Sequence, residues 1–378
     1  MAMNQLIEGL IEAGHKVKVL AVSSQKYPVK PGDIPPDYRR KTAIEFVDMD
    51  LSVKPFPALL NLFSKESYHV RRFISKDFEK KLMEILQKEK FDIVQMETLF
   101  MAPYLPVIRK YSKAKVLLRA HNIEHLIWKR LAQTNNNPVK KMYLRHLYTT
   151  LENFEKTMSG RFDAILPITE KDALFFKNQS RRPVKTIPFG VNMEKYPAVQ
   201  NHSPEHALFH IGAMNWMPNE EGIAWFLKEV WPRLIKKHPA IKLYLAGRVM
   251  PPWLKNLHEK NVTVVGEVPS ARDFIASKSI SIVPLFSGSG VRIKIIESMA
   301  LGKAVVSTRT GAEGIAYTPG KDLLVADTAE EFAEAISYLY THPGKVMEMG
   351  KNARKLMEEK HDNRKIIRTL SRFYQEIL

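Results

Sequence analysis

A short glycine-rich loop is the part of the sequence best suited to chemistry. Ser287-Gly288-Ser289-Gly290 follows an apolar run at 280–285, predicted to be a buried strand, and precedes a helix predicted from about Val291 to Gly302. Glycine allows the backbone to approach a ligand closely. A loop that leads into a helix N-terminus also presents unpaired amide N–H groups at the positive end of the helix dipole, which favours phosphate.

Charged side chains after the loop fit the same interpretation. Arg292 and Lys294 are expected in the first turn of the helix, where a cation costs roughly 0.3–1 kcal/mol unless an anion is bound nearby. Glu297 lies one turn beyond Lys294, and its carboxylate could accept hydrogen bonds from sugar hydroxyls. Geometry alone leaves a structural alternative open, in which a buried crossover helix extends two cations along their apolar stems to solvent.

Two common nucleotide-binding motifs are excluded. Ile293 stands where the dinucleotide-binding motif G-x-G-x-x-G requires its third glycine. No G-K-[ST] follows the loop, so it is not a phosphate loop of the Walker type either. The predicted phosphate site therefore belongs to neither class.

Two further loops are predicted to lie beside the glycine loop. The segment 212–216 follows a strand that begins at Ala207, and Gly247-Arg248 follows a strand that begins at Lys242. The carboxyl ends of parallel strands meet at one edge of a sheet, where ligands bind in open α/β folds. The three loops are therefore expected to converge on one crevice.

The stretch GSGVRIKIIE, followed by TGAEG, resembles the donor site of retaining glycosyltransferases of family 4, which have the GT-B fold. The resemblance implies that Glu297, as the second glutamate of an E-x7-E motif, binds the ribose of a nucleotide diphosphate sugar. Ser289 replaces the first glutamate, which usually faces the transferred sugar. Met214, Asn215 and Trp216 stand where the family commonly has a basic residue, so Arg248 and Arg292 are the candidates for the phosphate charge. The full predicted diphosphate site is Gly212, Arg248, Ser289, Gly290, Val291, Arg292 and Lys294, with Val268 at the base.

His121 is the candidate catalytic residue in the first half of the chain. It follows the apolar strand residues 116–118, so it is expected at the carboxyl end of a strand, where ligands bind. The resemblance implies that His121 contacts the transferred sugar or the acceptor, and that Arg292 and Glu297 are also catalytic. Arginine and helix-end amides can stabilise the charge that develops on a departing diphosphate.

A metal site is the alternative for the same segment. His121, Glu124 and His125 match H-x-x-E-H, an inverted zinc-peptidase pattern that needs both histidines on one helical face. The apolar strand that runs up to His121 leaves only His125 in a helix, so no metal and no other cofactor is expected. Glu152 and Glu155 could form a catalytic carboxylate pair, but a solvated helix face is the favoured interpretation.

Strands that alternate with helices predict an α/β fold with parallel sheets. With the resemblance, this predicts two Rossmann-like domains facing a cleft: 1–198 on the acceptor side and 199–361 for donor binding, with a linker at 193–206. The last helix, 362–378, is expected to cross back to the first domain. Strands are predicted within 17–23, 44–50, 91–98, 115–122, 162–172, 184–197, 207–214, 242–248, 262–268, 280–285, 304–309 and 323–326.

The composition limits the possible partners. The 378 residues are 45% hydrophobic, include no cysteine and carry a net charge of +18. Disulfides and thiolate chemistry are excluded, and no apolar run approaches the ~20 residues that span a bilayer. The charge fits nucleic acid, anionic lipid, an anionic substrate or simply a solvated basic surface. No nucleic-acid-binding motif accompanies it, so nucleic acid is not expected as a partner.

A hydrophobic surface segment is predicted near the start of the chain. Residues 52–70 combine prolines with Phe56, Phe63 and Tyr68. In the related fold such a segment faces the acceptor or the membrane, and a hydrophobic lid over the core is the alternative. The expected location is cytoplasmic, with the inner face of the plasma membrane as a peripheral site.

The predicted function is a retaining, metal-independent transfer of a sugar from a nucleotide diphosphate sugar to a glycan or lipid-linked acceptor in cell-envelope polysaccharide synthesis. The chain opens with a helix around 6–11, without the strand and Gly-Gly loop that usually open the family's fold. That feature favours an alternative, a catalytically impaired protein that still binds the nucleotide sugar. A polyanion- or membrane-binding protein is a third class, which depends on charge alone.

Overall fold

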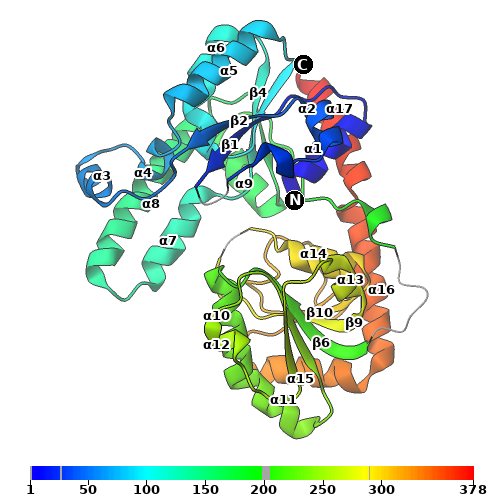
Figure 1. Ribbon diagram of the computed structural model, residues 1–378. Helices are drawn as coiled ribbons and strands as arrows, with labels where there is room; N and C mark the ends of the chain where they lie inside the picture. Colours follow the sequence, from blue (N-terminus) through cyan, green and yellow to red (C-terminus); the bar gives the residue numbers. More distant parts are fainter. Residues whose placement is uncertain (1, 26–27, 198–204, 289) are drawn as a thin grey trace. The chain divides into compact units, whose positions relative to one another are not determined.

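The chain folds into two compact units (Figure 1). Unit 1 comprises residues 1–188 and 367–378, and unit 2 comprises residues 189–366. The computed structural model describes residues 2–25, 28–197, 205–288 and 290–378. Two predictions fall outside the described residues: most of the second half of the linker, and Ser289 of the glycine loop.

The last helix passes from unit 2 into unit 1 along the chain. Helix α17 (Asn363–Ile377) begins in unit 2, and residues from 367 onward belong to unit 1. There Tyr374 donates a hydrogen bond to Gln95 Oε1 at 2.7 Å. The crossover predicted for the last helix is therefore confirmed. The contact boundary at residue 188 precedes the predicted boundary at residue 198.

Unit 1 contains two parallel sheets. Strand β1 pairs with β2, and β4 lies between β3 and β5 in the second sheet. Strand β4 is central in this sheet, and its apolar residues 116–118, whose side chains alternate between the two faces, are fully buried. The strands are β1 (Leu20–Ser24), β2 (Glu45–Met49), β3 (Ile93–Met96), β4 (Lys115–Ala120) and β5 (Ala164–Pro167), each at a predicted position.

The segment 184–197, predicted as a strand with a loop, pairs with β5 only at its start. Lys185 N donates to Ile165 O at 3.1 Å, and Ile187 N donates to Pro167 O at 2.8 Å. Val184 and Val191 form isolated β-bridges, to Ile165 and Asp362. Pro188 lacks the N–H group that a continuous ladder would need, so pairing does not extend through the segment. The segment is a connecting loop that ends in the short 3₁₀ helix η4 (Met193–Lys195).

Side-chain caps fix several helix starts in unit 1. The Asn137 side chain caps the helix that begins at Pro138 by accepting from Lys140 N. Thr169 caps the helix that begins at Glu170 by accepting from Asp172 N. The helices are α1 (Ala2–Glu12), α2 (Pro36–Thr42), α3 (Pro55–Leu60), α4 (Tyr68–Arg71), α5 (Lys76–Lys88), α6 (Leu105–Tyr111), α7 (Glu124–Thr134), α8 (Pro138–Ser159) and α9 (Glu170–Gln179), with 3₁₀ turns η1 (Pro31–Asp33), η2 (Asn61–Phe63) and η3 (Leu99–Tyr104).

Unit 2 is built on one parallel sheet of six described strands. Their order is β11-β10-β9-β6-β7-β8, so the chain runs outward from β6 to one edge and then returns to the other side of β6. The reversal between β6 and β9 is a topological switch point, the place where ligands bind in doubly wound sheets. The strands are β6 (Glu205–Ile211), β7 (Leu243–Ala246), β8 (Val262–Gly266), β9 (Lys278–Val283), β10 (Ala304–Ser307) and β11 (Leu324–Val325).

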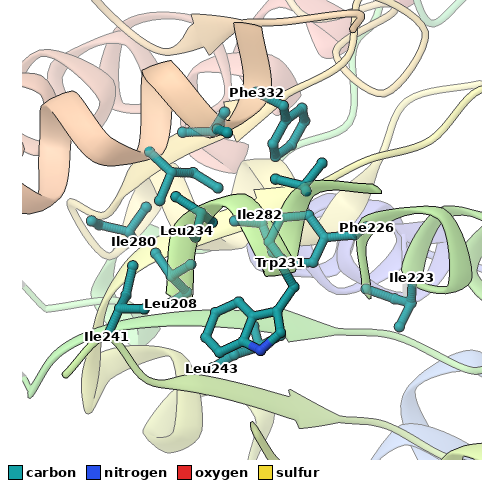
Figure 2. Close-up of a cluster of buried hydrophobic side chains, with 14 of the residues drawn as sticks. Leu208, Ile223, Phe226, Trp231, Leu234, Ile241, Leu243, Ile280, Ile282 and Phe332 are labelled. Carbon is teal, nitrogen blue, oxygen red and sulfur yellow. The ribbon is translucent and has the colours of Figure 1, made fainter. Parts of the chain in front are cut away.

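Apolar side chains from the sheet and its helices form the core of unit 2. Figure 2 shows Leu208, Leu243, Ile280 and Ile282 from the strands together with aromatic residues that include Trp231 from a helix. The surrounding helices are α10 (Met217–Trp225), a π-helical turn η5 (Phe226–Val230), α11 (Trp231–Lys237), α12 (Pro252–Lys255), α13 (Ala271–Ala276), α14 (Ile293–Ala300), α15 (Ala329–Thr341) and α16 (Pro343–Lys360). No described helix is both long and apolar enough to cross a bilayer.

Helix α14 carries the residues predicted to bind the donor. It begins at Ile293 rather than near Val291, so Arg292 is the N-cap residue and only Lys294 lies in the first turn. The helix ends at Ala300, and Gly302 adopts a positive φ of 66°, as predicted for a left-handed terminus. The first-turn placement of Arg292 was wrong because the glycine loop extends two residues further than expected.

Candidate functional site

Three loops converge at the carboxyl edge of the unit 2 sheet. The amide of Gly212, after β6, donates to Ala246 O at 3.0 Å, and the amide of Met214 donates to Arg248 O at 2.9 Å. A Cβ atom at Gly247 would lie 1.7 Å from Gly212 O, so only glycine permits this approach. The first two loops are therefore in direct backbone contact.

Lys294 links the third loop to the first. Its Nζ donates to Asn219 Oδ1 at 2.7 Å and contacts His210 Nε2 at 3.0 Å. A Cβ atom at Gly212 would lie 2.5 Å from the same Nζ. The structure thus brings Gly212 and Lys294 together at the switch point, and the predicted convergence of the three loops is observed.

The protonation of this network follows from its geometry. His210 Nδ1 lies 2.8 Å from the carbonyl oxygen of Ile282, so Nδ1 carries the proton and Nε2 accepts from Lys294. Burial, followed by the charge of Lys294, lowers the pKa of His210 well below its usual value. Burial, followed by the charge of Arg292, lowers the pKa of Lys294 to about 7. At neutral pH Lys294 is therefore only partly charged, and a bound anion would favour its protonation.

Arg292 supports the glycine loop from inside. Its side chain is only 5% exposed, and its Nη1 donates to Gly290 O at 2.6 Å. Nη2 donates to Ser287 O at 3.4 Å, and the guanidinium lies 5.3 Å from the centre of the Trp216 ring. Arg292 thus orients the loop amides, in addition to adding charge behind them.

The glycine loop has the backbone conformation that its glycines allow. Gly288 and Gly290 have positive φ values of 94° and 83°. A Cβ atom at Gly288 would also lie 3.0 Å from the Trp216 ring. The side chain of Val291 is buried, so only its backbone can contribute to a ligand site.

Glu297 is oriented by a residue that the sequence analysis missed. Tyr196 donates from Oη to Glu297 Oε1 at 2.8 Å; Tyr196 is buried and Glu297 is partly buried. Burial raises the pKa of Glu297, although the hydrogen bond from Tyr196 opposes that shift. The only sequence signal for Tyr196 was its position in the connecting loop, among polar residues.

Arg248 and Val268, also predicted for the donor site, lie at the same sheet edge outside the Lys294 network. The side chain of Arg248 is exposed, and its backbone carbonyl accepts from Met214. Val268 is partly buried and lies two residues beyond the end of β8. His210 and Asn219 were missed, since a histidine inside an apolar strand and an asparagine inside a helix are usually structural.

His121 belongs to a second polar cluster, at the carboxyl edge of the larger sheet of unit 1. Its Nε2 lies 2.9 Å from Oε2 of Glu97, which follows β3. Buried Arg119, on β4, lies 3.7 Å from the same oxygen. Burial alone would raise the pKa of Glu97, but His121 and Arg119 outweigh it and lower the pKa. Glu97 was missed although it ends a predicted strand, where polar side chains meet ligands.

The two histidines of the H-x-x-E-H segment have different carboxylate partners, Glu97 for His121 and Glu155 for His125. His125 Nδ1 lies 2.5 Å from Glu155 Oε2, and the amides of Glu124 and His125 also donate to Glu155. Within the described residues, no group of three or more histidine, aspartate or glutamate side chains could hold a metal ion. The solvated face predicted for Glu152 and Glu155 was wrong for Glu155, which is 1% exposed because it anchors the start of α7.

The comparisons with known proteins concern unit 2 first. Residues 205–342, which contain the glycine loop and Lys294, match the family described as Glycosyl transferases group 1. This match confirms the glycosyltransferase resemblance of the loop motif, whereas assignment to the retaining family 4 remains a prediction.

The similarity to known proteins extends over both units. An uncharacterized 44.6 kDa protein in the cps region of Klebsiella pneumoniae is 29% identical over 304 residues, 77% of this chain and 76% of that protein. Sucrose-phosphate synthase from Thermosynechococcus elongatus superposes with a TM-score of 0.68 at 15% identity, over 99% of this chain and 92% of that one. Anabaena HepE in complex with UDP-glucose superposes with a TM-score of 0.62 at 15% identity, over 95% and 99%. The fold is therefore GT-B, as predicted.

Proposed function

We propose that the protein transfers a sugar from a nucleotide diphosphate sugar to a glycan or lipid-linked acceptor, with retention of anomeric configuration and without a metal ion. The main support is that the switch point of the unit 2 sheet brings together the glycine loop, Gly212 and Lys294. Solved relatives support the donor class, since HepE was crystallised with UDP and with UDP-glucose.

The diphosphate is assigned to the amides at the start of α14 and to Lys294. The amides after Gly290 lie at the positive end of the helix dipole, and Arg292 fixes the loop that presents them. Lys294 approaches the same edge from the first turn of α14. As the bond between the anomeric carbon and the diphosphate breaks, negative charge grows on the phosphate oxygens. These donors then stabilise the transition state more than the ground state.

The sugar and acceptor roles are assigned to Glu297 and His121. Glu297, held by Tyr196, accepts hydrogen bonds from the ribose hydroxyls. His121 donates to a hydroxyl of the transferred sugar or acceptor, with Glu97 holding the imidazole in place. The cps region of the Klebsiella pneumoniae relative supports capsule polysaccharide as the acceptor class.

A binding and transfer assay tests the proposal. Purified protein should be stabilised against heat by one member of a panel that includes UDP-glucose and GDP-mannose, and should release the nucleotide diphosphate in the presence of EDTA when an acceptor is supplied. Glu297→Gln should weaken donor affinity at least about 10-fold, because loss of a hydrogen bond to a charged group costs about 1.5–3 kcal/mol.

Glu330→Gln is the matched control, since Glu330 is an exposed carboxylate at the start of α15. Equal donor affinity of the Glu297→Gln and Glu330→Gln variants would remove Glu297 from the site. Donor binding without transfer to any acceptor would instead support the alternative of a binding protein.

A further inference from the structure

A group of large apolar side chains in unit 1 faces outward. In α3 and the adjoining η2, Phe56 is 70% exposed, Leu59 58%, Leu60 54% and Phe63 90%. Monomeric proteins rarely expose contiguous apolar groups of this size without a binding role. The concentration of four such residues in eight positions therefore needs an explanation.

The N-terminal turn of α8 adds to the same surface. Val139 is 70% exposed and Met142 is 64% exposed, one turn apart on one face of the helix. Asn61, between Leu60 and Phe63, accepts at its carbonyl from His146, one turn further along α8, at a distance of 2.9 Å. The two apolar groups are therefore neighbours on one surface.

The outward side chains stand on an ordered base. Ala58 of α3 and Tyr68 of α4 pack against Leu144 and Leu147 of α8 in a buried cluster. The Tyr68 hydroxyl also accepts a hydrogen bond from the N–H of Lys54 and donates one to the carbonyl of Lys54. In Figure 1, α3 lies beside α4 at the left side of unit 1 in this view. The segment is thus not a lid over the core, because Ala58 faces inward whereas the large apolar side chains of α3 and η2 face solvent.

Cations surround the exposed apolar residues. The exposed basic residues in these elements are Lys54, Lys65, Arg71, Lys140, Lys141 and Arg145. The acidic residues near them are Glu66, which is exposed, and Asp50, which forms an ion pair with Lys54 at 3.1 Å. Apolar side chains inside a cationic border match a bilayer that carries negative headgroups.

We propose that residues 53–65 and 139–145, named here the apolar–basic surface, bind an anionic lipid bilayer. Phe56 and Phe63 insert at the level of the headgroups, where aromatic rings are favoured. The lysines and arginines remain at the headgroup phosphates, with their apolar stems along the membrane. This surface holds unit 1 at the membrane and does not depend on the donor chemistry of unit 2.

Vesicle sedimentation tests the proposal with the full chain. We expect binding to phosphatidylcholine vesicles that contain 30% phosphatidylglycerol, and at least 10-fold weaker binding to pure phosphatidylcholine. Phe56→Ser with Phe63→Ser should weaken binding to anionic vesicles at least 10-fold at any salt concentration. Lys140→Glu with Lys141→Glu should weaken it at low salt most, because salt screens charge but not apolar insertion.

Matched controls come from α16 of unit 2. Met347 is 72% exposed, and Lys351 and Lys355 are exposed on the same helix. Met347→Ser and Lys351→Glu with Lys355→Glu should leave vesicle binding unchanged. All variants should keep the wild-type melting temperature, since the altered side chains point to solvent.

Two outcomes overturn the proposal. One is equal binding of wild-type protein to neutral and anionic vesicles, or to neither. The other is equal loss of binding in the surface variants and the α16 controls, which would indicate non-specific attraction of a basic protein. Failure of the nucleotide-sugar assay would leave the vesicle test unaffected, because vesicle sedimentation is measured without a nucleotide sugar.

Discussion

Lys294 is the residue on which the electrostatics of the candidate donor site depend. Its ammonium group contacts two neutral side chains, those of His210 and Asn219, rather than a carboxylate. Burial and the nearby Arg292 disfavour its charged form. The site therefore contains a base that is about half protonated near pH 7 before an anion binds.

Binding of a diphosphate should raise the pKa of Lys294, because the anion stabilises the ammonium form. Below pH 7 the lysine is already charged, so donor affinity is constant. Above pH 7 donor binding requires proton uptake, so the affinity falls as the pH rises. We expect the Kd for UDP-glucose to rise up to about 10-fold per pH unit between pH 7 and 9. Both phosphates of this ligand are diesters, so the ligand itself does not titrate there.

Calorimetry in buffers of different ionisation enthalpy measures the proton uptake directly. Lys294→Met should bind more weakly at pH 7 and lose both the uptake and the pH dependence. Lys303→Met is the control, because burial also lowers the pKa of Lys303, to about 8, while its Nζ bonds Ala276 O away from the three loops. A pH-independent Kd in the wild type would contradict the assignment.

At the scale of elements, the close approach of two loops depends on glycine. Gly247 has a positive φ of 148°, and the space for its side chain is occupied by the carbonyl of Gly212. The contact holds the ends of β6 and β7 in register at the site. Loops after parallel strands were predicted to meet here, but the backbone contact itself could not be read from two isolated glycines.

Two glycine-to-alanine variants separate strain from collision. Gly266→Ala pays only for a positive φ of 79°, with no atom within 4 Å of the new Cβ, and should lower the free energy of unfolding by about 1 kcal/mol. Gly247→Ala adds a collision with Gly212 and should lower it by about 3 kcal/mol or more. Urea unfolding of both variants measures the difference. Equal losses would mean that the two loops separate easily.

At the scale of the whole molecule, the sequence predicted the elements better than the side chains. Apolar runs located most of the strands, because this signal is local. The carboxyl-edge rule then located the convergence of the three loops. Only the start of 184–197 pairs with β5, because Pro188 lacks the N–H group that would continue the ladder.

Side-chain roles that depend on distant partners could not be predicted. Glu155 looked solvated because its partner His125 lies 30 residues earlier in the chain. Arg292 was expected to point at a ligand, but contacts with Ser287 and Trp216 turn it beneath the loop. His210 was hidden because nothing local distinguishes it from a buried structural histidine. Such orientations are fixed by tertiary contacts, which spacing does not encode.

The central position of β6 has a consequence for how unit 2 opens. Its backbone groups are paired with β7 on one side and β9 on the other, and residues 207–210 are buried. Strand β8, at the edge, alternates between exposed and partly buried residues. Deuterium should therefore replace the amide protons of residues 208–211 last and those of 262–266 much earlier. Mass spectrometry of the exchanging protein would show that β6, beneath the candidate donor site, exchanges more slowly than β8. Similar exchange rates in the two strands would contradict the prediction.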